Sequence, residues 1–517
     1  MSVLTSFRKK FIEMREDIIL MLNGEIERIP PVKSDLTLMN WLRNNKNLTG
    51  TKEGCAEGDC GACTLVIGRY DYSSKAVAWR AVNSCILFLP MLDGCSVRTV
   101  EGLASNTGEL HPVQTAFVEN HASQCGFCTP GFVMSLYAGW CKNRNLDNAA
   151  IDDLFAGNLC RCTGYRPIKQ AAFHTNDIPV KERDTLFRDE EEKFIIENLA
   201  REDLSLQVKH LDRQIRFDAP RRLQNVQEIL HTHTPLILSG GTDIGLWVTK
   251  KHMELDHFLY LGNVEALNQL DEDDEGFVIG AAITHEGAMQ KMGAHFEALQ
   301  ELWRRFGSEQ VRASGTVVGN IANGSPIADI SPAFIALGAS LTLNARGKIR
   351  VIPIGSFFIA YGEQDLQEGE FVQSVYIPKL KDNEVFQSFK ISRRFDQDIS
   401  AVMGAFLLSV DNDGNLQKAE IAYGGMAAIP KAASTLSKFL IGQDIENLPL
   451  AECRKAIEAD FQPISDVRAS REYRYDMALN LLVKAINNLA GKPISYLAGA
   501  DIQQVISTSF VAEHKNG

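Results

Sequence analysis

The cysteines of this 517-residue chain are strongly clustered. Ten of the eleven lie between Cys55 and Cys162, and only Cys453 stands apart from them. The first residues, Met1–Asp17, mix charged and apolar side chains and lack the apolar core of a secretion signal. Cysteines in a chain of this kind are typical of metal or redox chemistry rather than of a disulfide framework. We therefore expect this chemistry in the N-terminal third.

The first cysteine group has the spacing Cys55-x4-Cys60-x2-Cys63, followed downstream by Cys85. This is the plant-type pattern of [2Fe-2S] ligation, in which four thiolates hold two irons. Glycines at 54, 58 and 61 are interleaved with the ligands and allow a loop to wrap tightly round a cluster. A structural zinc site also uses four cysteines, usually as two closely spaced pairs, and is the alternative.

The second group joins Cys125-x2-Cys128 to Cys160-x-Cys162. Four thiolates from two loops are enough for a second [2Fe-2S] cluster, but this spacing alone leaves zinc as a serious rival. Two neighbouring clusters would make an electron path, whereas a zinc ion beside a cluster would not, so we favour a second cluster. The other cysteines, Cys95, Cys141 and Cys453, are expected to be small buried side chains.

The N-terminal region has the pattern of a small β-sheet domain that ends near Thr99. An Asn-Gly turn at Asn23 separates the strand-like runs 18–22 and 25–29. A helix is expected over 36–42, and further strands over 64–68 and 76–83. This order of elements suits a β-grasp domain.

Residues 112–172 have helical patterns. A helix is expected here, with Thr129 as its N-cap and Pro130 at its first position, and it continues through 132–142. Further helices are expected over 148–159 and from 167. A charged stretch over 176–210, poor in large apolar residues, is expected to be a linker. Mixed strand and helix patterns follow, with a break near Phe386.

Two later segments are rich in small and polar residues. Leu236–Ile244 is an apolar strand that opens into a Gly-Gly turn, where backbone N–H groups could hold a pyrophosphate. Ala313–Asp329 is dense in Gly, Ser, Thr and Asn, as a backbone pressed against a polar cofactor would be. An ordinary strand-turn and a surface loop are the alternatives, because the chain has no G-x-G-x-x-G or Walker pattern.

Charge and hydropathy narrow the classes of partner. The net charge is −12, from 53 Lys and Arg against 65 Asp and Glu, which disfavours nucleic acid. No run approaches the roughly 18 consecutive apolar residues that a membrane-spanning helix needs. We expect a cytoplasmic protein that binds neither nucleic acid nor membranes.

Three cysteine-bearing motifs together resemble the iron-sulfur domains of molybdenum hydroxylases. These motifs are Glu53–Cys63, Gln124–Gly131 and Asn158–Arg166. The order of iron-sulfur domains followed by a flavin domain looks like the small subunit of bacterial xanthine dehydrogenases within that family. The resemblance covers about residues 17–490.

The resemblance implies an α+β multidomain fold. The expected parts are a β-grasp ferredoxin domain, a helical-bundle [2Fe-2S] domain, an FAD-binding domain of the vanillyl-alcohol-oxidase-like type and a CO-dehydrogenase-flavoprotein-like α/β domain. Their expected bounds are 17–100, 101–175, 211–386 and 387–495, with an N-terminal extension over 1–16, the linker over 176–210 and a tail over 496–517.

The resemblance also implies an FAD site. Phe306 could equally be core packing, and Lys390 precedes a charged loop with Asp396 and Asp398 that is either solvated or borders the flavin ring. The implied FAD contacts are Leu236, Ile237, Leu238, Ser239, Gly240, Gly241, Thr242, Asp243, Ile244, Phe306, Gly319, Asn320, Ser325, Asp329, Val372 and Lys390.

The function that the resemblance implies is electron transfer. Electrons would pass from the Cys125 group to the Cys55 group, then to FAD and to NAD, for which Tyr361 is a candidate contact. The chain is too short for the family's molybdopterin domain, which implies a separate catalytic subunit in an (αβ)2 assembly that oxidises hypoxanthine and xanthine to urate. The alternatives are a subunit of another molybdenum hydroxylase, acting on aldehydes or N-heterocycles, and a non-enzymatic redox sensor or zinc scaffold.

Overall fold

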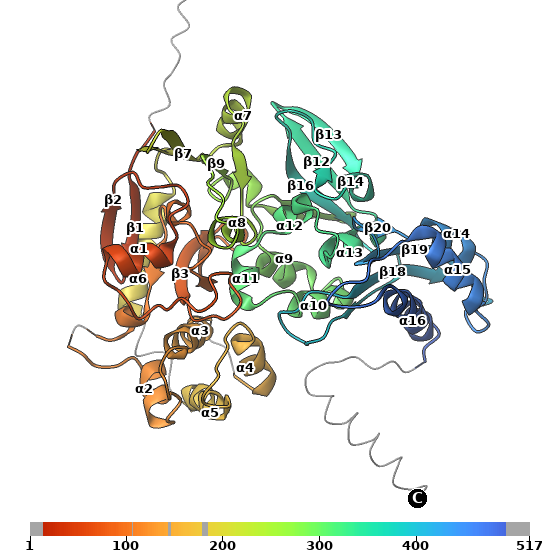
Figure 1. The fold of residues 1–517 in the computed structure, drawn as a ribbon, viewed down its shortest axis with the longest axis horizontal. Coiled ribbons are helices and arrows are strands. Elements are labelled where there is room, and N and C mark those ends of the chain that lie inside the picture. Colours follow the sequence, from red (N-terminus) through yellow and green to blue (C-terminus); the bar gives the residue numbers. More distant parts are fainter. Residues whose placement is uncertain (1–13, 106, 143–145, 178–184, 493–517) are drawn as a thin grey trace, which may run out of the picture.

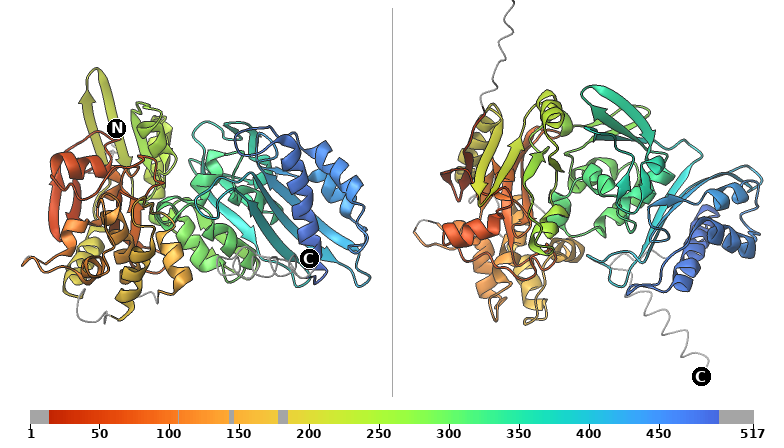
Figure 2. Two further views of the ribbon diagram at one scale, coloured as in Figure 1. Left: turned by 60° about the horizontal axis from the view of Figure 1, so that its bottom comes forward. Right: turned by 45° about the horizontal axis from the view of Figure 1, so that its top comes forward.

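The computed structural model describes residues 14–105, 107–142, 146–177 and 185–492. Most of the expected extension 1–16 and all of the expected tail 496–517 lie outside the described residues. The N-terminal sheet and the helical region lie at one end of the molecule, and the C-terminal sheet lies at the other (Figures 1 and 2). No helix in the described ranges has the length and apolar character required to cross a bilayer.

The N-terminal domain is a five-stranded sheet of order β2-β1-β5-β3-β4, in which β1 and β5 are parallel. The hairpin at Asn23 and the strands fall where the sequence predicts them. Helix α1 begins later than expected, at Leu38, because the Thr37 side chain caps it by accepting the Asn40 N–H. The elements are β1 Ile18–Leu22, β2 Glu25–Ile29, α1 Leu38–Asn45, β3 Thr64–Asp71, β4 Ala76–Asn83, η1 Leu89–Leu92 and β5 Ser96–Arg98.

The helical domain packs on one face of β3 and β4 through a core that includes Val66, Trp79 and Ala81. Helix α3, Thr129–Cys141, begins one residue earlier than expected, because Cys128 and not Thr129 occupies the N-cap position. Helix α4 ends at Phe155, before the expected Leu159, so that residues 156–160 turn back toward the sheet. The elements are η2 Val100–Leu103, α2 Pro112–Glu119, α3 Thr129–Cys141, α4 Asn148–Phe155, α5 Arg166–His174 and η3 Thr175–Asp177.

The expected linker over 176–210 is largely structured. Helix α6 spans Thr185–Asn198, and strand β6, Leu204–His210, already belongs to the next sheet. Phe194 and Ile195 of α6 cover Ile19 and Met21, so strand β1 is buried on both faces. The Glu191 carboxylate on the same helix accepts a hydrogen bond from buried Arg98, with Nε–Oε1 at 3.0 Å. The expectation of a linker was wrong. The composition of this stretch is dominated by charged residues, but its few apolar residues are enough to pack α6 against the sheet.

Two sheets form the middle of the molecule, with orders β6-β7-β9-β8 and β10-β11-β16-β12-β13. The first sheet shares one core with the N-terminal domain, in which the rings of Phe88 and Phe258 lie 5.4 Å apart. The elements after β6 are β7 Arg213–Ala219, α7 Leu223–Thr232, β8 Leu236–Leu238, α8 Ile244–Thr249, β9 His257–Tyr260, η5 Glu265–Leu267, β10 Leu270–Glu272, β11 Gly276–Gly280, α9 His285–Met292, α10 Glu297–Arg304, α11 Glu309–Ser314, α12 Val317–Asn323, α13 Ile330–Ala336, β12 Ser340–Ala345, β13 Lys348–Pro353, η6 Ile354–Ser356, β14 Phe358–Ala360, β15 Glu363–Gln364 and β16 Phe371–Pro378.

The C-terminal domain is an antiparallel sheet of order β17-β18-β19-β20 covered by helices. One face packs on these helices, and Met403, Ala405 and Leu407 of the central strand face the core of the middle region. The elements are β17 Val385–Ile391, β18 Val402–Val410, β19 Leu416–Gly424, β20 Lys431–Ala432, α14 Ser434–Leu440, α15 Leu450–Asp460 and α16 Arg471–Leu489. Shared cores therefore hold neighbouring domains at fixed positions.

Candidate iron-sulfur and flavin sites

The first cysteine group gathers in the loop before β3 and at the end of β4. The sulfurs of Cys63 and Cys85 lie 3.2 Å apart, and both side chains are buried. The Cys55 sulfur accepts the backbone N–H groups of Asp59 at 3.4 Å and Cys60 at 3.3 Å. Backbone N–H groups that point at sulfur are the interactions that stabilise thiolate ligands of a cluster.

Glycine is required where this loop doubles back. Gly58 and Gly61 have φ angles of 78° and 69°, in the left-handed region. A Cβ on Gly54 would lie 2.7 Å from the Cys60 sulfur. The interleaved glycines therefore let the loop close round its own thiols, as the sequence predicts.

The thiols of the first group perturb one another. Hydrogen bonds from the Cys60 and Cys85 thiols lower the pKa of Cys55. A hydrogen bond from Cys85 likewise lowers the pKa of Cys63, and the same contacts raise the pKa of Cys60 and of Cys85. Because the thiolate is the metal ligand, this concentration of thiols that share protons suits a site that takes up metal with release of protons.

The second cysteine group lies on two loops of the helical domain. Cys125 and Cys162 are exposed, and Cys128 and Cys160 are partly buried. The backbone N–H of Phe127 and the Cys162 thiol lower the pKa of Cys125, whereas burial raises the pKa of Cys128 to about 12. Burial would also raise the pKa of Cys160, but hydrogen bonds from Thr163 outweigh it and lower the pKa.

The thiols of the first group are connected by successive contacts, and those of the second group lie in two pairs. Cys55 contacts Cys60 and Cys85, while Cys125 contacts Cys162 and Cys128 contacts Cys160. Among the described residues, no three His, Cys, Asp or Glu side chains are arranged to hold a single metal ion. The paired sulfurs, the N–H groups directed at them and the glycine turns fit a multinuclear cluster on four thiolates at each group.

The two cysteine groups meet at a buried junction. The Leu159 N–H donates to the Cys60 carbonyl oxygen at 3.0 Å. The Asn158 side chain donates to the Gly61 carbonyl oxygen at 3.2 Å, and a Cβ on Gly61 would lie 2.1 Å from the Gly157 carbonyl oxygen. The loop that carries Cys60 and the loop that precedes Cys160 are therefore in direct contact.

Gln310 of α11 closes this junction from the middle region. Its side-chain amide donates to Thr64, Ser135 and Asn158 at 3.3, 3.1 and 3.1 Å. Thr64 follows Cys63, and Asn158 lies two residues before Cys160. Gln310 was not predicted from the sequence, because nothing local in α11 signals a contact with the N-terminal and helical domains.

The predicted flavin residues surround a cavity of about 540 Å³. A Cβ on Gly240 would lie 2.4 Å from the Ser314 carbonyl oxygen, so the two small-residue segments approach each other closely at its wall. The volume and the mixed lining suit a cofactor. The predicted residues that line the cavity are Leu236, Ile237, Ser239, Gly240, Gly241, Thr242, Asp243, Ile244, Phe306, Gly319, Asn320 and Val372.

Four predicted flavin contacts lie outside this lining. Leu238 is fully buried in β8, where it belongs to the core shared with the N-terminal domain. Lys390 and Asp329 form a buried ion pair with a Nζ–Oδ2 distance of 2.7 Å. Ser325 is partly buried in the turn after α12, where its carbonyl oxygen accepts the Ala328 N–H.

The charged loop after β17 contacts the iron-sulfur region and not the cavity. None of residues 391–399 lines the cavity. The Phe395 ring stacks on Arg305, and Asp398 accepts the backbone N–H groups of Arg393 and Arg394. The position of Asp396 and Asp398 beside a flavin ring therefore stays a prediction, with a solvated loop as its alternative.

His285, which no sequence motif singles out, lines the cavity at the start of α9. Its ring lies 4.4 Å from that of Phe306, and its Nδ1 accepts the Trp303 indole N–H at 3.3 Å. Burial lowers the pKa of His285 to about 3. The imidazole is therefore neutral with its proton on Nε2. A lone histidine in the sequence does not signal that its side chain will be buried beside a cavity.

Tyr361 is an exposed residue next to one that lines the cavity. It is 76% exposed on the turn between β14 and β15, and the next residue, Gly362, lines the cavity. Its ring is thus available to a molecule that approaches from solvent.

Helix α8 joins the cavity to the first cysteine group. Its residue Gly245 packs against Ile86, which follows Cys85, at a distance that would place a Cβ 2.7 Å from the Ile86 side chain. The Thr249 hydroxyl donates to the Ala56 carbonyl oxygen, next to Cys55, at 2.7 Å. Ile244, at the other end of the helix, lines the cavity.

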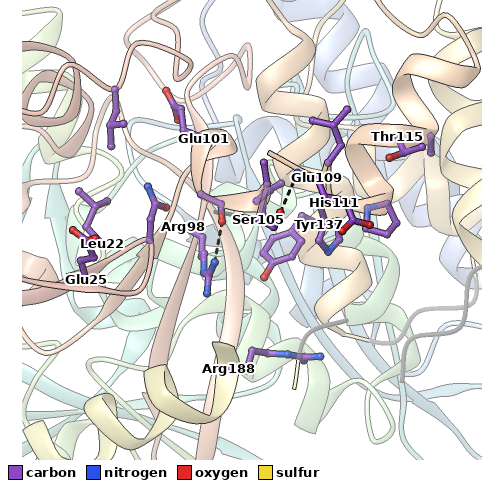
Figure 3. A pocket seen from close by; sticks show the side chains of 18 of the residues that line it. Leu22, Glu25, Arg98, Glu101, Ser105, Glu109, His111, Thr115, Tyr137 and Arg188 are labelled. Atoms are coloured by element: carbon purple, nitrogen blue, oxygen red, sulfur yellow. Dashed lines mark hydrogen bonds between the residues drawn. The ribbon is translucent and has the colours of Figure 1, made fainter. Parts of the chain in front are cut away.

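A larger cavity of about 1160 Å³ lies between the N-terminal sheet and the helical domain (Figure 3). Its lining carries charges of both signs, including Glu25, Arg98 and Glu101, and His111 packs edge-on against Tyr137 with ring centres 5.2 Å apart. None of the predicted ligand cysteines or flavin contacts lines it.

Family models match three parts of the chain. Residues 99–173 match the [2Fe-2S] binding domain, residues 213–380 match the FAD binding domain in molybdopterin dehydrogenase, and residues 387–489 match the CO dehydrogenase flavoprotein C-terminal domain. The chain is therefore an FAD- and [2Fe-2S]-containing protein of the molybdenum hydroxylase family.

Similar proteins include xanthine dehydrogenases. Xanthine dehydrogenase 1 of Arabidopsis thaliana is 30% identical over 535 residues, which cover 90% of this chain and 39% of that protein. Xanthine dehydrogenase/oxidase of Rattus norvegicus is 32% identical over 458 residues, which cover 80% of this chain and 34% of that protein. The chain thus spans well under half the length of these relatives.

A solved structure also resembles part of the chain. Reconstituted CO dehydrogenase from Oligotropha carboxidovorans matches with a TM-score of 0.48 and 24% identity, over 52% of this chain and 94% of that chain.

Proposed function

We propose that this chain is the electron-transfer subunit of a molybdenum hydroxylase. Bound iron-sulfur clusters supply one-electron transfer, and bound FAD supplies the conversion between one-electron and two-electron chemistry. The residues that would hold the clusters are Cys55, Cys60, Cys63 and Cys85 in one group and Cys125, Cys128, Cys160 and Cys162 in the other. The cavity beside Gly240 and Gly241 would hold FAD.

The observation that carries the proposal is the position of the first cysteine loop. On one side it contacts the loop of the second group through Cys60 and Leu159. On the other side it contacts α8, which reaches the flavin cavity, through Ala56 and Thr249. The contacts therefore run in the order second group, first group, flavin cavity, and this supports the electron path from Cys125 through Cys55 to FAD.

The exposed second group is the natural entry point for electrons. Cys125 and Cys162 are exposed, and the apolar side chains of Phe127, Leu159 and Tyr165 beside them are also exposed. An apolar rim of this kind is suited to burial against another protein. We infer that a molybdopterin-bearing subunit docks here, in an (αβ)2 assembly.

The finer proposal is a xanthine dehydrogenase that passes electrons to NAD. The relatives of about 30% identity carry that name and match 90% and 80% of this chain. The substrate would be bound by the partner subunit, so a hydroxylase of aldehydes or N-heterocycles is the second candidate. Identification of the copurifying large subunit, and of the substrate that bleaches the flavin of the complex, separates the two.

The test of the proposed function uses the full chain purified with its cofactors. We expect about four irons and four inorganic sulfides per chain, flavin absorption, and oxidation of NADH with an artificial dye. A colourless protein that contains zinc and no sulfide would overturn the proposal and favour a zinc scaffold. A fully loaded protein that does not oxidise NADH would overturn the NAD assignment alone.

A further inference from the structure

Gln397 reaches across the molecule from the C-terminal domain to both cysteine loops. It lies in the loop between β17 and β18, with a left-handed φ angle of 48°. The loop is held in this shape because Asp398 accepts the N–H groups of Arg393 and Arg394 at 2.8 and 2.9 Å, and Arg394 donates to the Gln397 carbonyl oxygen at 2.9 Å. A non-glycine residue held in this region marks a constrained position.

The two N–H bonds of the Gln397 amide are both directed at backbone carbonyl oxygens. Nε2 donates to Ala156 at 2.7 Å and to Asp59 at 3.3 Å. Ala156 follows α4 on the way to Cys160, and Asp59 lies between Cys55 and Cys60. Because both acceptors are carbonyl oxygens, only the NH2 group of the amide can face them.

The contact with Asp59 acts on one particular peptide group. The carbonyl oxygen of the Asp59–Cys60 peptide accepts from Gln397, and the N–H of the same peptide donates to the Cys55 sulfur at 3.3 Å. A hydrogen bond at the carbonyl end orients the peptide plane and polarises its N–H, which strengthens the N–H···S bond. The three groups therefore form a chain from Gln397 to a ligand sulfur.

We propose that Gln397 is a positioning residue that raises the reduction potential of the cluster on Cys55, Cys60, Cys63 and Cys85. This inference rests on the proposed function. Reduction adds negative charge to a cluster, and an N–H dipole directed at a ligand sulfur stabilises that charge. Loss of the Gln397 amide weakens this dipole and makes the reduced form less stable.

The second group serves as an internal reference. The Cys160 sulfur accepts the Thr163 N–H and is hydrogen-bonded to the Thr163 hydroxyl, and neither bond involves the peptide after Ala156 whose carbonyl oxygen Gln397 contacts. Loss of Gln397 should therefore shift the potential of the first cluster and leave that of the second unchanged. A purely structural bridge between domains would instead affect both clusters, or neither, together with stability.

The test is a potentiometric titration of the holoprotein followed by electron paramagnetic resonance, which resolves the two clusters. Gln397→Met keeps the side-chain volume and removes the N–H donors. We expect the midpoint potential of the first cluster to fall by an amount that corresponds to about a tenfold change in the equilibrium constant for reduction, or about 59 mV for one electron. The matched control is Gln300→Met on α10, which removes a hydrogen bond of 2.7 Å to the Gly293 carbonyl oxygen at the end of α9.

A second variant covers the case in which Gln397→Met does not load its clusters. Gln397→Gly removes the same donors and suits the left-handed φ angle, so it relieves backbone strain instead of adding it. An unchanged first midpoint in a loaded variant, or equal shifts of both midpoints, overturns the inference. A wild-type protein without two reducible clusters overturns the proposed function itself, which is a different outcome from two clusters that ignore Gln397.

Discussion

The ammonium of Lys390 and the carboxylate of Asp329 pair at 2.7 Å, with side chains that are 3% and 6% exposed. The Ser400 hydroxyl donates to the other carboxylate oxygen, and Lys390 also donates to the Arg305 carbonyl oxygen at 3.2 Å. The pair thus joins strand β17 to the start of α13. Its charges are tolerated in the interior only because each satisfies the other.

Lys390→Met is expected to lower the free energy of unfolding by about 3–5 kcal/mol, because it leaves the Asp329 carboxylate buried and unpaired. Chemical denaturation followed by tryptophan fluorescence measures the loss. The control is Lys492→Met, which breaks a pair with Glu446 at the same 2.7 Å distance but with side chains that are 45% and 57% exposed. We expect at most about 1 kcal/mol there. Equal losses in the two variants would contradict the role assigned to burial.

Gly61→Ala is expected to abolish the junction between the cysteine groups. Its φ angle of 69° disfavours a side chain, and a Cβ would lie 2.1 Å from the Gly157 carbonyl oxygen, a backbone atom that cannot move aside easily. We expect loss of the first cluster, and so roughly half of the iron, as measured by iron and sulfide analysis. Gly414→Ala is the control, since that glycine has a φ angle of 85° and a Cβ added to it would meet no atom within 4 Å. Normal iron content in Gly61→Ala would show that the close approach is dispensable.

The grouping of the cysteines and much of the N-terminal sheet could be predicted from the sequence. Ligand spacing such as Cys55-x4-Cys60 is a local property, and so is the Asn23-Gly24 turn that sets the register of the first hairpin. The Gly-Gly turn at Gly240 was likewise found from local pattern, and it lines the cavity.

What the sequence did not reveal depends on contacts between distant segments. Helix α6 has the composition of a solvated linker, and contacts with a distant segment, such as Phe194 on Ile19 and Met21, make it part of the fold. Gln310 and Gln397 belong to no motif, because their acceptors lie on other domains. Lys390 and Asp329 were both expected at the flavin, which stays a prediction, and the sequence does not signal that the two side chains form a buried ion pair with each other.

His285 is expected to make stability depend on pH. Burial lowers its pKa in the folded protein from 6.5 to about 3, with the charge of Arg312 as a smaller cause. Between these two values the unfolded chain binds a proton that the folded protein does not, so stability is full above pH 6.5 and falls as the pH drops toward 3. The slope from this group approaches about 1.4 kcal/mol per pH unit.

The pH series is measured by chemical denaturation of wild type and His285→Gln. The variant should lack this component and show a shallower fall below pH 6.5, while His252→Gln, at an exposed position, controls for the substitution itself. Parallel curves for wild type and His285→Gln would mean that the imidazole is protonated in the folded protein.

Tyr361→Ala tests the proposed approach of NAD to the flavin cavity. The ring is 76% exposed beside Gly362, so its removal should cost little stability. If the ring contacts the nicotinamide nucleotide, KM for NADH in the dye-coupled assay should rise about tenfold, equivalent to about 1.4 kcal/mol of binding. The rate at saturating NADH should change little, because a contact made equally in the ground and transition states affects KM alone. Ile359→Ala, on the neighbouring strand β14 and 55% exposed, is the matched control for loss of an apolar side chain from this hairpin. An unchanged KM in Tyr361→Ala, or an equal rise in both variants, would remove Tyr361 from the NAD site.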